Sequence, residues 1–251
     1  MAGERHQATD GRRRDRVLKT GRMTFSPVME TATRYNRWIV EAFAEALQGT
    51  ILEVGFGHQG LRPLLPRGVN YIGIDVDEEV VREARCGLPE WQVVQADISD
   101  TSLPQLLAGT RVDTVLCVNV LEHVADDRAA IINLLSCLQP GGQLCLFVPA
   151  FSGLYNDLDR LAGHLRRYRT GDVEALVPEG LGRMARVEYF NPVGGLGWWL
   201  NGLLRHEELS ARAVRHQVQV FDRLILPVSR ALNPLTRRVF GQSVLAIVER
   251  M

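Results

Sequence analysis

The chain has 251 residues, a formal net charge of zero and an apolar share of 46%. A chain of this length can bury a substantial core within one α/β domain. The neutral charge balance argues against a protein that binds nucleic acid or a membrane surface through its overall charge. No apolar run reaches the roughly 20 residues that a membrane-spanning helix needs, so we expect no stable membrane insertion. The charged N-terminus lacks the apolar core of a signal peptide.

The cysteines also bear on the location of the protein. Cys86, Cys117, Cys137 and Cys145 include no C-x-x-C pair. Cys117 and Cys145 lie within apolar, strand-like runs, which indicates buried free thiols. Because free thiols are typical of a reducing compartment, we expect a cytoplasmic protein.

Residues 1–25 are predicted to be a disordered basic tail. The stretch up to residue 22 is rich in arginine and shows no periodicity, and it has no aromatic residue for stacking on bases. Ser26 and Pro27 then supply an N-cap and a first helical residue. Apolar residues follow at helix spacing until Gly49, so a helix over residues 26–49 should open a single domain that runs to residue 251.

From Thr50 onward, strand-like and helix-like segments alternate along the chain. The expected strands are residues 50–57, 70–77, 91–98, 112–120 and 143–150, with the longest helical pattern between them at 122–138. Continuous strands rich in Val, Ile and Leu, separated by helices, indicate a mostly parallel sheet covered on both faces. The chain is therefore predicted to be a doubly wound α/β protein, which binds ligands at the carboxyl ends of its strands.

The first expected strand ends in EVGFGHQG, residues 53–60. Glycines in such a turn permit positive φ and let backbone N–H groups approach a ligand closely. GFGHQG fits the dinucleotide fingerprint G-x-G-x-x-G, whereas EVGFG also fits the start of an S-adenosylmethionine site. Asp75 ends the second strand, where a carboxylate can accept both hydroxyls of an adenosine ribose. Both cofactors share these two features.

The next strand ends favour S-adenosylmethionine over a nicotinamide cofactor. The third strand ends in Ala96-Asp97-Ile98, which offers an acceptor for the adenine amine beside an apolar residue for the ring. The fourth ends in NVLEH, residues 119–123, and LQPGG precedes the fifth. A nicotinamide enzyme has no need of this series.

With these motifs in this order, the chain resembles a class I S-adenosylmethionine-dependent methyltransferase of the small-molecule type. EVGFG resembles the first motif of that superfamily, GIDVD its ribose-binding strand, QADI its adenine-binding segment, NVLEHV its fourth motif and LQPGG the turn before strand five. The resemblance covers about residues 34–150. Further segments resemble a bacterial subfamily, namely RYNRW (34–38), GHLRRYR (163–169), YFNPVGGLGWWLNG (189–202) and FGQSVLAI (240–247).

The resemblance implies a Rossmann-like sheet of seven strands, the last antiparallel, with residues 50–150 as the S-adenosylmethionine-binding core. It implies a set of cofactor-binding residues, which are Tyr35, Glu53, Gly55, Phe56, Gly57, Gln59, Asp75, Val76, Asp97, Ile98 and Asn119. Position 59 departs from the superfamily, where a third glycine is usual, and the next glycine is Gly60. The Gln59 amide would either weaken binding or contact the carboxylate of the cofactor.

Residues 151–251 are predicted to form the substrate side of the domain. A helix should start at Thr170, a sixth strand should cover 186–190, and the last strand should cover 243–248. Between these strands, residues 194–239 form a helical insertion with two apolar stretches. The insertion fits an added helical layer or homodimer face, a lid over the acceptor site, or a peripheral membrane contact.

In methyl transfer, the protein mainly has to hold the acceptor in line with the methyl group. A base helps when the acceptor is a hydroxyl, and the candidates are His123, His164 and Tyr168. The sequence has no N-P-P-Y set and no Pro-Cys nucleophile, so nucleic acid is not the expected acceptor. It shows no clear cluster of metal ligands, so no metal is expected, and metal-dependent catechol chemistry is kept as an alternative.

The sequence thus predicts methyl transfer to an oxygen or nitrogen atom of a small-molecule or saccharide acceptor. One alternative is a protein of the same fold that binds S-adenosylmethionine without transferring the methyl group. The other is a nicotinamide-dependent oxidoreductase.

Overall fold

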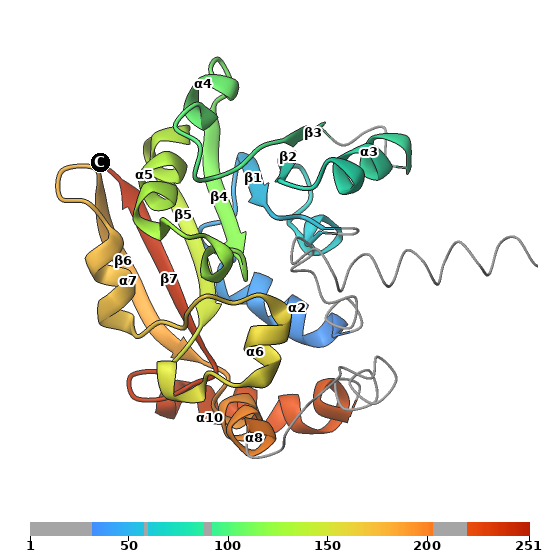
Figure 1. The fold of residues 1–251 in the computed structure, drawn as a ribbon, viewed down its shortest axis with the longest axis vertical. Coiled ribbons are helices and arrows are strands. Elements are labelled where there is room, and N and C mark those ends of the chain that lie inside the picture. The colour runs from blue at the N-terminus through green and yellow to red at the C-terminus, as the bar shows by residue number, and fades with distance from the viewer. Residues whose placement is uncertain (1–31, 58–59, 88–91, 203–219) are drawn as a thin grey trace, which may run out of the picture.

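The computed structural model describes residues 32–57, 60–87, 92–202 and 220–251, arranged around one central sheet (Figure 1). The predicted disordered tail and the first residues of the predicted opening helix lie outside the described residues, as does Gln59.

The sheet has seven strands in the order β3-β2-β1-β4-β5-β7-β6. Its strands are β1 (Thr50–Val54), β2 (Asn70–Asp75), β3 (Gln92–Gln95), β4 (Val112–Val118), β5 (Leu138–Pro149), β6 (Gly182–Phe190) and β7 (Ser243–Arg250). The first five pair in parallel, whereas β7 lies antiparallel between β5 and β6. The predicted mostly parallel, seven-stranded sheet with an antiparallel last strand is therefore confirmed.

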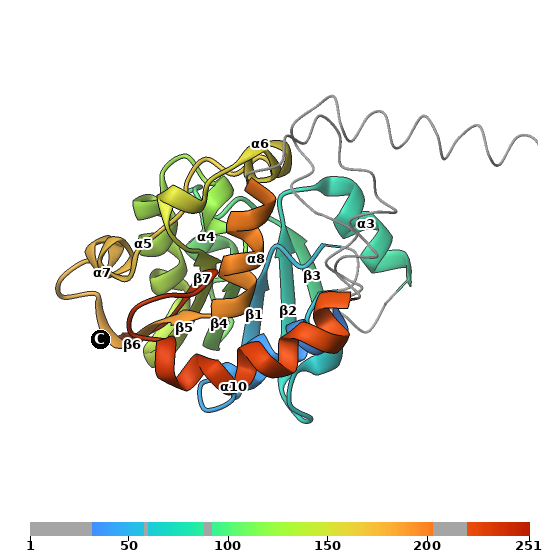
Figure 2. The same cartoon turned by 90° about the horizontal axis from the view of Figure 1, so that it is seen from below.

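Helices cover both faces of this sheet. The helical elements are α2 (Thr33–Ala42), η2 (Arg62–Leu64), α3 (Glu78–Gly87), α4 (Leu103–Leu106), η3 (Leu121–His123), α5 (Asp127–Cys137), η4 (Ser152–Leu154), α6 (Asp157–Ala162), α7 (Thr170–Leu176), α8 (Pro192–Gly202), the π-helix η5 (Phe221–Ile225) and α10 (Leu226–Thr236). Figure 2 shows α2 and α10 on one side of the sheet and α5 and α7 on the other. No helix in the described part of the chain is long and apolar enough to span a membrane.

The alternation of side chains along the strands explains the two layers. Val115 and Cys117 of β4 pack into the core cluster on the side of α5 and α7, whereas Leu116 packs into the cluster on the side of α2. Successive strand residues point to opposite faces, so a strand that is apolar throughout must be covered twice. Cys117 and Cys145 are both fully buried free thiols, as predicted, and burial raises their pKa.

Some element boundaries differ from those predicted. The regular part of α2 ends at Ala42, and hydrogen-bonded turns continue to Leu47, where the hydroxyl of Thr114 donates to the carbonyl of Ala46 at 2.7 Å. The long helix expected from residue 122 is split into η3 and α5, because the Asp126 side chain caps α5 by accepting from the Ala129 N–H at 2.9 Å. The insertion is helical in its described parts.

The first turn of α2 depends on a carboxylate that lies far away in sequence. Ala32, at the N-cap position, makes no side-chain capping bond. Instead the carboxylate of Asp222, in η5, accepts from the backbone N–H of Tyr35 at 2.7 Å and of Arg34 at 3.2 Å. The insertion and α2 are thereby joined by a capping interaction across 187 residues of sequence.

We predict that Asp222→Ala lowers the free energy of unfolding by about 1.5–3 kcal/mol, because it removes charge-assisted hydrogen bonds to a buried helix end. Asp157→Ala is the control, since Asp157 forms a surface ion pair with Arg160 at 2.8 Å, and its loss should cost about 0–1 kcal/mol. Denaturant titration measures both values. Equal losses in the two variants would contradict a capping role for Asp222.

Candidate active site

The glycine-rich turn after β1 lies where the strand order reverses, between β1 and β4. Gly55, Gly57 and Gly60 all have positive φ, at 67°, 57° and 59°. A Cβ on Gly55 would lie 2.5 Å from Cγ2 of Val120, so the turn touches the segment that follows β4. Doubly wound sheets bind their ligands in the crevice at such a reversal point.

The Glu53 side chain holds the C-terminal end of this turn through hydrogen bonds. Its carboxylate is 4% exposed and accepts from the Leu61 N–H at 2.6 Å and from the Tyr71 hydroxyl at 2.8 Å. Burial raises the pKa of Glu53 to about 7, although these hydrogen bonds oppose the shift. A Cβ on Gly60 would lie 2.9 Å from Oε2 of Glu53. Glu53 therefore requires a glycine at position 60, one residue later than in the superfamily pattern.

Asp75, at the end of β2, is bonded to the same turn. Its Oδ2 accepts from the Gly57 N–H at 3.0 Å, and its Oδ1 accepts from the Asp77 N–H at 3.0 Å. Burial raises the pKa of Asp75, while these hydrogen bonds oppose the shift. Each carboxylate oxygen can accept more than one hydrogen bond, so the group retains capacity for hydroxyls of a ligand.

A hollow opens beside Asp75, at the ends of β2 and β3. It is lined by Val76, Gln95, Ala96, Asp97, Asp100, Ser102, Leu103 and Leu106. Val76 is 60% exposed and Leu106 is 53% exposed, so both present apolar surface at the hollow. Asp97 is held in place there, because its Oδ1 accepts from the N–H and the hydroxyl of Ser99 at 2.8 and 2.7 Å. The hollow combines apolar walls with a fixed acceptor, as a flat heteroaromatic ring requires.

Three residues expected at the cofactor place their side chains in the core instead. Ile98 is 5% exposed and packs in the cluster of α4 and α5, so Leu106, which was not predicted, provides the apolar surface at the hollow. Phe56 packs with Val80 of α3. Tyr35 lies among aromatic rings, including Phe147 and Phe221, and burial raises its pKa. Such apolar neighbours are the preferred packing partners of aromatic and branched side chains.

Asn119, at the end of β4, has an unusual backbone conformation. Its φ is 53° and its N–H donates to the Phe147 carbonyl at 2.8 Å. Residues other than glycine rarely adopt positive φ, and such strain clusters at binding and catalytic sites. Asn119 directs the chain into η3, which carries Glu122 and His123.

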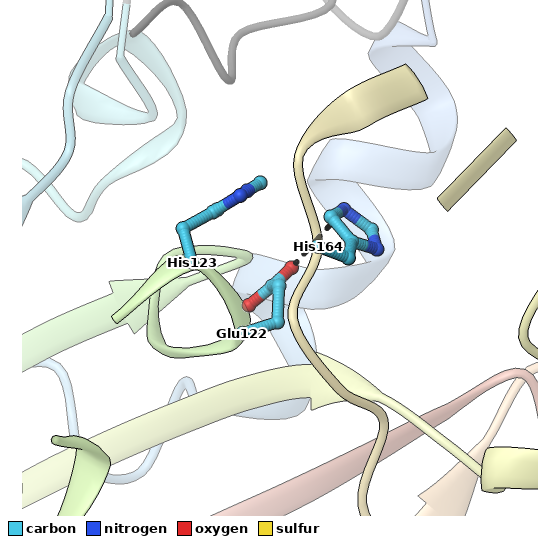
Figure 3. A group of neighbouring side chains, drawn as sticks. All are labelled: Glu122, His123 and His164. Atoms are coloured by element: carbon cyan, nitrogen blue, oxygen red, sulfur yellow. Dashed lines mark ion pairs between the residues drawn. The ribbon is translucent and has the colours of Figure 1, made fainter. Parts of the chain in front are cut away.

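Glu122, His123 and His164 form a group at this edge of the sheet (Figure 3). Glu122 is fully buried, and neither of its carboxylate oxygens has a hydrogen-bond partner in the described part of the chain. Burial raises the pKa of Glu122 to about 7. Oε1 of Glu122 lies 3.8 Å from Nε2 of His164, and the two imidazole rings meet edge to face at 4.8 Å.

The two histidines are oriented by different partners. Nδ1 of His123 lies 3.2 Å from the Gly163 carbonyl, and burial together with the neighbouring His164 lowers the pKa of His123 to about 4. Nδ1 of His164 lies 2.7 Å from Oδ1 of Asp159. Because Nδ1 of each ring faces an oxygen acceptor, Nδ1 of each ring carries an N–H. The neutral His123 imidazole therefore has its lone pair on Nε2.

Asp159 was not predicted, yet it is the centre of the polar contacts around His164. It is fully buried, and Arg167 donates to its Oδ1 through Nε at 2.9 Å and Nη2 at 2.8 Å. The Trp198 indole N–H donates to its Oδ2 at 3.3 Å. Burial alone would raise the pKa of Asp159, but the hydrogen bonds from His164 and Arg167 leave it lowered. The capping box that begins at Asn156 is the sequence signal that could have found it.

Tyr168 lies in the core and is 3% exposed. Its hydroxyl lies 3.0 Å from Oδ2 of Asp127 and 3.3 Å from the Leu121 carbonyl, and burial raises its pKa. Arg166 also pairs with Asp127, at 2.7 Å. Tyr168, a candidate base from the sequence, and its neighbour Arg167 are therefore both buried with polar partners inside the fold.

The structure brings together three residues of metal-ligating type, although the sequence shows no clear cluster of such residues. The ligand atoms of Glu122, His123 and His164 lie within 4.8 Å of one another. The sequence does not reveal this group, because His164 lies beyond β5 and far from Glu122 along the chain. After β5 the chain returns to η3, where the Leu165 N–H donates to the Glu122 carbonyl at 2.8 Å.

The chain is similar to known proteins over part of its length. Residues 52–146 match the family described as "Methyltransferase domain". The chain is 38% identical over 99 residues to a protein named "Ubiquinone biosynthesis O-methyltransferase" from Xanthomonas euvesicatoria pv. vesicatoria, covering 38% of this chain and 41% of the relative. A protein of the same name from Dechloromonas aromatica is 31% identical over 125 residues, covering 49% and 53%. The chain thus spans about half the length of these relatives.

Solved structures share the fold over more of the chain. A putative sarcosine dimethylglycine methyltransferase from Galdieria sulphuraria superposes with a TM-score of 0.57 at 14% identity, covering 96% of this chain and 97% of the other. A SAM-dependent methyltransferase from Archaeoglobus fulgidus gives a TM-score of 0.55 at 14% identity, covering 86% and 92%. At this identity the likeness shows a common fold.

We predict that Gly60→Ala destabilises the protein more than Gly68→Ala. Both residues have positive φ, at 59° and 85°, but a Cβ on Gly68 would meet nothing within 4 Å. Gly68→Ala should therefore cost only the conformational penalty of about 1–2 kcal/mol, whereas Gly60→Ala adds a clash with Glu53. Denaturant titration of both variants measures the difference. An equal cost would mean that the Glu53 contact does not constrain the turn.

Proposed function

We propose that this chain, which contains a class I methyltransferase domain, transfers a methyl group from S-adenosylmethionine to an oxygen atom of a small-molecule or saccharide acceptor. The observation that carries the proposal is the position of the Glu122–His123–His164 group, next to the glycine-rich turn of the matched domain. The names of the relatives, which are O-methyltransferases, favour oxygen over nitrogen as the methylated atom.

The strand ends offer a suitable site for S-adenosylmethionine. The exposed backbone of Gly55 would lie against the methionyl part, and the Asp75 carboxylate would accept the ribose hydroxyls. The hollow with Val76 and Asp97 would take the adenine. When bound, S-adenosylmethionine supplies an electrophilic methyl group on a sulfonium.

The chain's own contribution on the acceptor side is to orient the reacting hydroxyl and to remove its proton. Nε2 of the neutral His123 carries a lone pair, because Nδ1 of that ring faces the Gly163 carbonyl, and Nε2 of His164 lies beside Glu122. The low pKa of His123 keeps its imidazole neutral at physiological pH, so it can bind a hydroxyl without first losing a proton. Tyr168 belongs to the packing beneath this group, since Asp127 and Leu121 engage its hydroxyl.

We predict that S-adenosylhomocysteine binds at about micromolar Kd in isothermal titration calorimetry, and that NAD does not bind. Asp75→Ala and Asp97→Ala should each weaken binding by about ten- to a hundredfold, as expected for the loss of a charge-assisted hydrogen bond. Glu249→Ala is the control, because Glu249 pairs with Gln143 at the opposite edge of the sheet. Binding of NAD without a response to S-adenosylhomocysteine would refute the cofactor assignment.

We predict that His123→Asn and His164→Asn each lower the rate of S-adenosylhomocysteine release by about a hundredfold or more while the affinity for the cofactor is kept. The assay uses a panel of phenolic and saccharide hydroxyl acceptors. Tyr168→Phe is the matched comparison, since its hydroxyl bonds to Asp127 within the fold, and its folded fraction should keep near-normal turnover. A larger loss of turnover in Tyr168→Phe than in the histidine variants would indicate that Tyr168 contacts the acceptor.

A further inference from the structure

We propose that Glu122, His123 and His164 bind a divalent transition-metal ion, most suitably Zn²⁺, which holds the acceptor oxygen. Binding of the ion follows from these residues alone, whereas its role in the reaction rests on the proposed methyl transfer. Figure 3 shows the three side chains converging from two separate segments of the chain, η3 and the segment after α6.

The spacing of the donor atoms suits one ion. The ligand atoms lie within 4.8 Å of one another, and Oε1 of Glu122 is 3.8 Å from Nε2 of His164. Ligands about 2.1 Å from a zinc ion are separated from each other by about 3.4 Å in tetrahedral geometry.

The Glu122 carboxylate supplies an independent sign of a missing ligand. It is fully buried, and within the described residues both of its oxygens lack a hydrogen-bond partner. A buried polar group without a partner is costly, and a charged one more so. Buried charges in proteins are paired or coordinate metals. Glu122 forms an ion pair with the His164 imidazole, but at 3.8 Å this contact is too long to be a hydrogen bond. An ion between the three side chains would satisfy the carboxylate directly.

The surroundings of both histidines match those of metal ligands. Metal-bound histidines almost always donate their second N–H to a carboxylate or a backbone carbonyl. Here Nδ1 of His164 faces Asp159 at 2.7 Å, and Nδ1 of His123 faces the Gly163 carbonyl at 3.2 Å. The backbone bond from Leu165 to Glu122 at 2.8 Å holds the two segments together, and the bond from His164 to Asp159 at 2.9 Å fixes the turn after α6. The donors are thus oriented before an ion arrives.

The chemistry of the three ligand side chains determines which metal ion they favour and what the bound ion can do. Two imidazoles and one carboxylate suit zinc and its first-row neighbours better than magnesium or calcium, which prefer oxygen donors. Three protein ligands leave at least one position open, as in catalytic zinc sites. With the ion bound, the two Nε2 atoms serve as ligands and no longer remove the proton themselves. An acceptor hydroxyl bound to the ion loses its proton to water instead, and the O–H electron pair stays on the oxygen, which becomes the nucleophile.

The test measures metal binding with no cofactor or acceptor present. Full-length protein, freed of metal by a chelator, is titrated with Zn²⁺ by calorimetry and with Co²⁺ by visible absorption. We expect one equivalent to bind, with a Co²⁺ spectrum typical of nitrogen and oxygen ligands. Glu122→Gln, His123→Asn and His164→Asn should each weaken binding at least tenfold.

Glu188→Gln is the matched control, because Glu188 is also buried but pairs with Arg186 and Arg237 on β6 and beyond, outside the site, and this variant should keep the wild-type metal affinity. The stability of the metal-free variants separates misfolding from loss of a ligand. Glu122→Gln should keep the wild-type melting temperature without metal and lose the increase that Zn²⁺ gives the wild type.

Wild-type affinity in all three ligand variants would place the ion elsewhere and overturn the proposal, as would the absence of binding to the wild type. Calorimetry with S-adenosylhomocysteine on the metal-free protein tests the proposed function separately. Cofactor binding without metal binding would refute the metal site alone, whereas metal binding without cofactor binding would refute the methyltransferase assignment and leave the metal site standing.

Discussion

The close approach of β1 to the segment after β4 is the constraint on which the candidate site depends. The strand order reverses between these two neighbours, so the chain leaves β1 and β4 toward opposite faces of the sheet. Gly55 has no side chain to fill the space that Val120 occupies, and Asn119 adopts positive φ to enter η3. The glycine turn and the Glu122–His123 segment therefore share one edge of the sheet.

A second constraint joins the substrate side to this edge. The buried carboxylate of Asp159 receives hydrogen bonds from Arg167, His164 and the Trp198 indole, which belong to different segments. A buried ion pair is favourable only when its remaining hydrogen-bonding groups are satisfied, and Arg167 is satisfied further by the Ala150 carbonyl at 3.1 Å. Because Trp198 lies in α8, the helical insertion is tied to the orientation of the His164 ring.

The sequence predicted the sheet because its strands are short, apolar and separated by helices, and the motifs at strand ends located Asp75, Asp97 and the glycine turn. It could not predict which way a side chain faces after a strand ends. Ile98 and Phe56 turn into the core, and their places depend on α4 and α3 packing against the sheet. The pairing of Glu122 with His164 depends on the return of the chain after β5, which local patterns do not encode.

Glu53 and Glu122 are both buried, but the desolvation cost of their carboxylates is offset in different ways. Burial raises the pKa of Glu53 and of Glu122 to about 7 in each case. Glu53 accepts from the Leu61 N–H and the Tyr71 hydroxyl, so its carboxylate is matched by groups of the fold and fixes the glycine turn. Among the described residues neither oxygen of Glu122 has a hydrogen-bond partner, and its ion pair with His164 spans 3.8 Å. Lone pairs on Glu122, His123 and His164 that are directed at one point repel each other unless a cation or a proton lies between them. A single proton can serve two of these acceptors, whereas a divalent ion can bind all three and still leave a position for an acceptor oxygen.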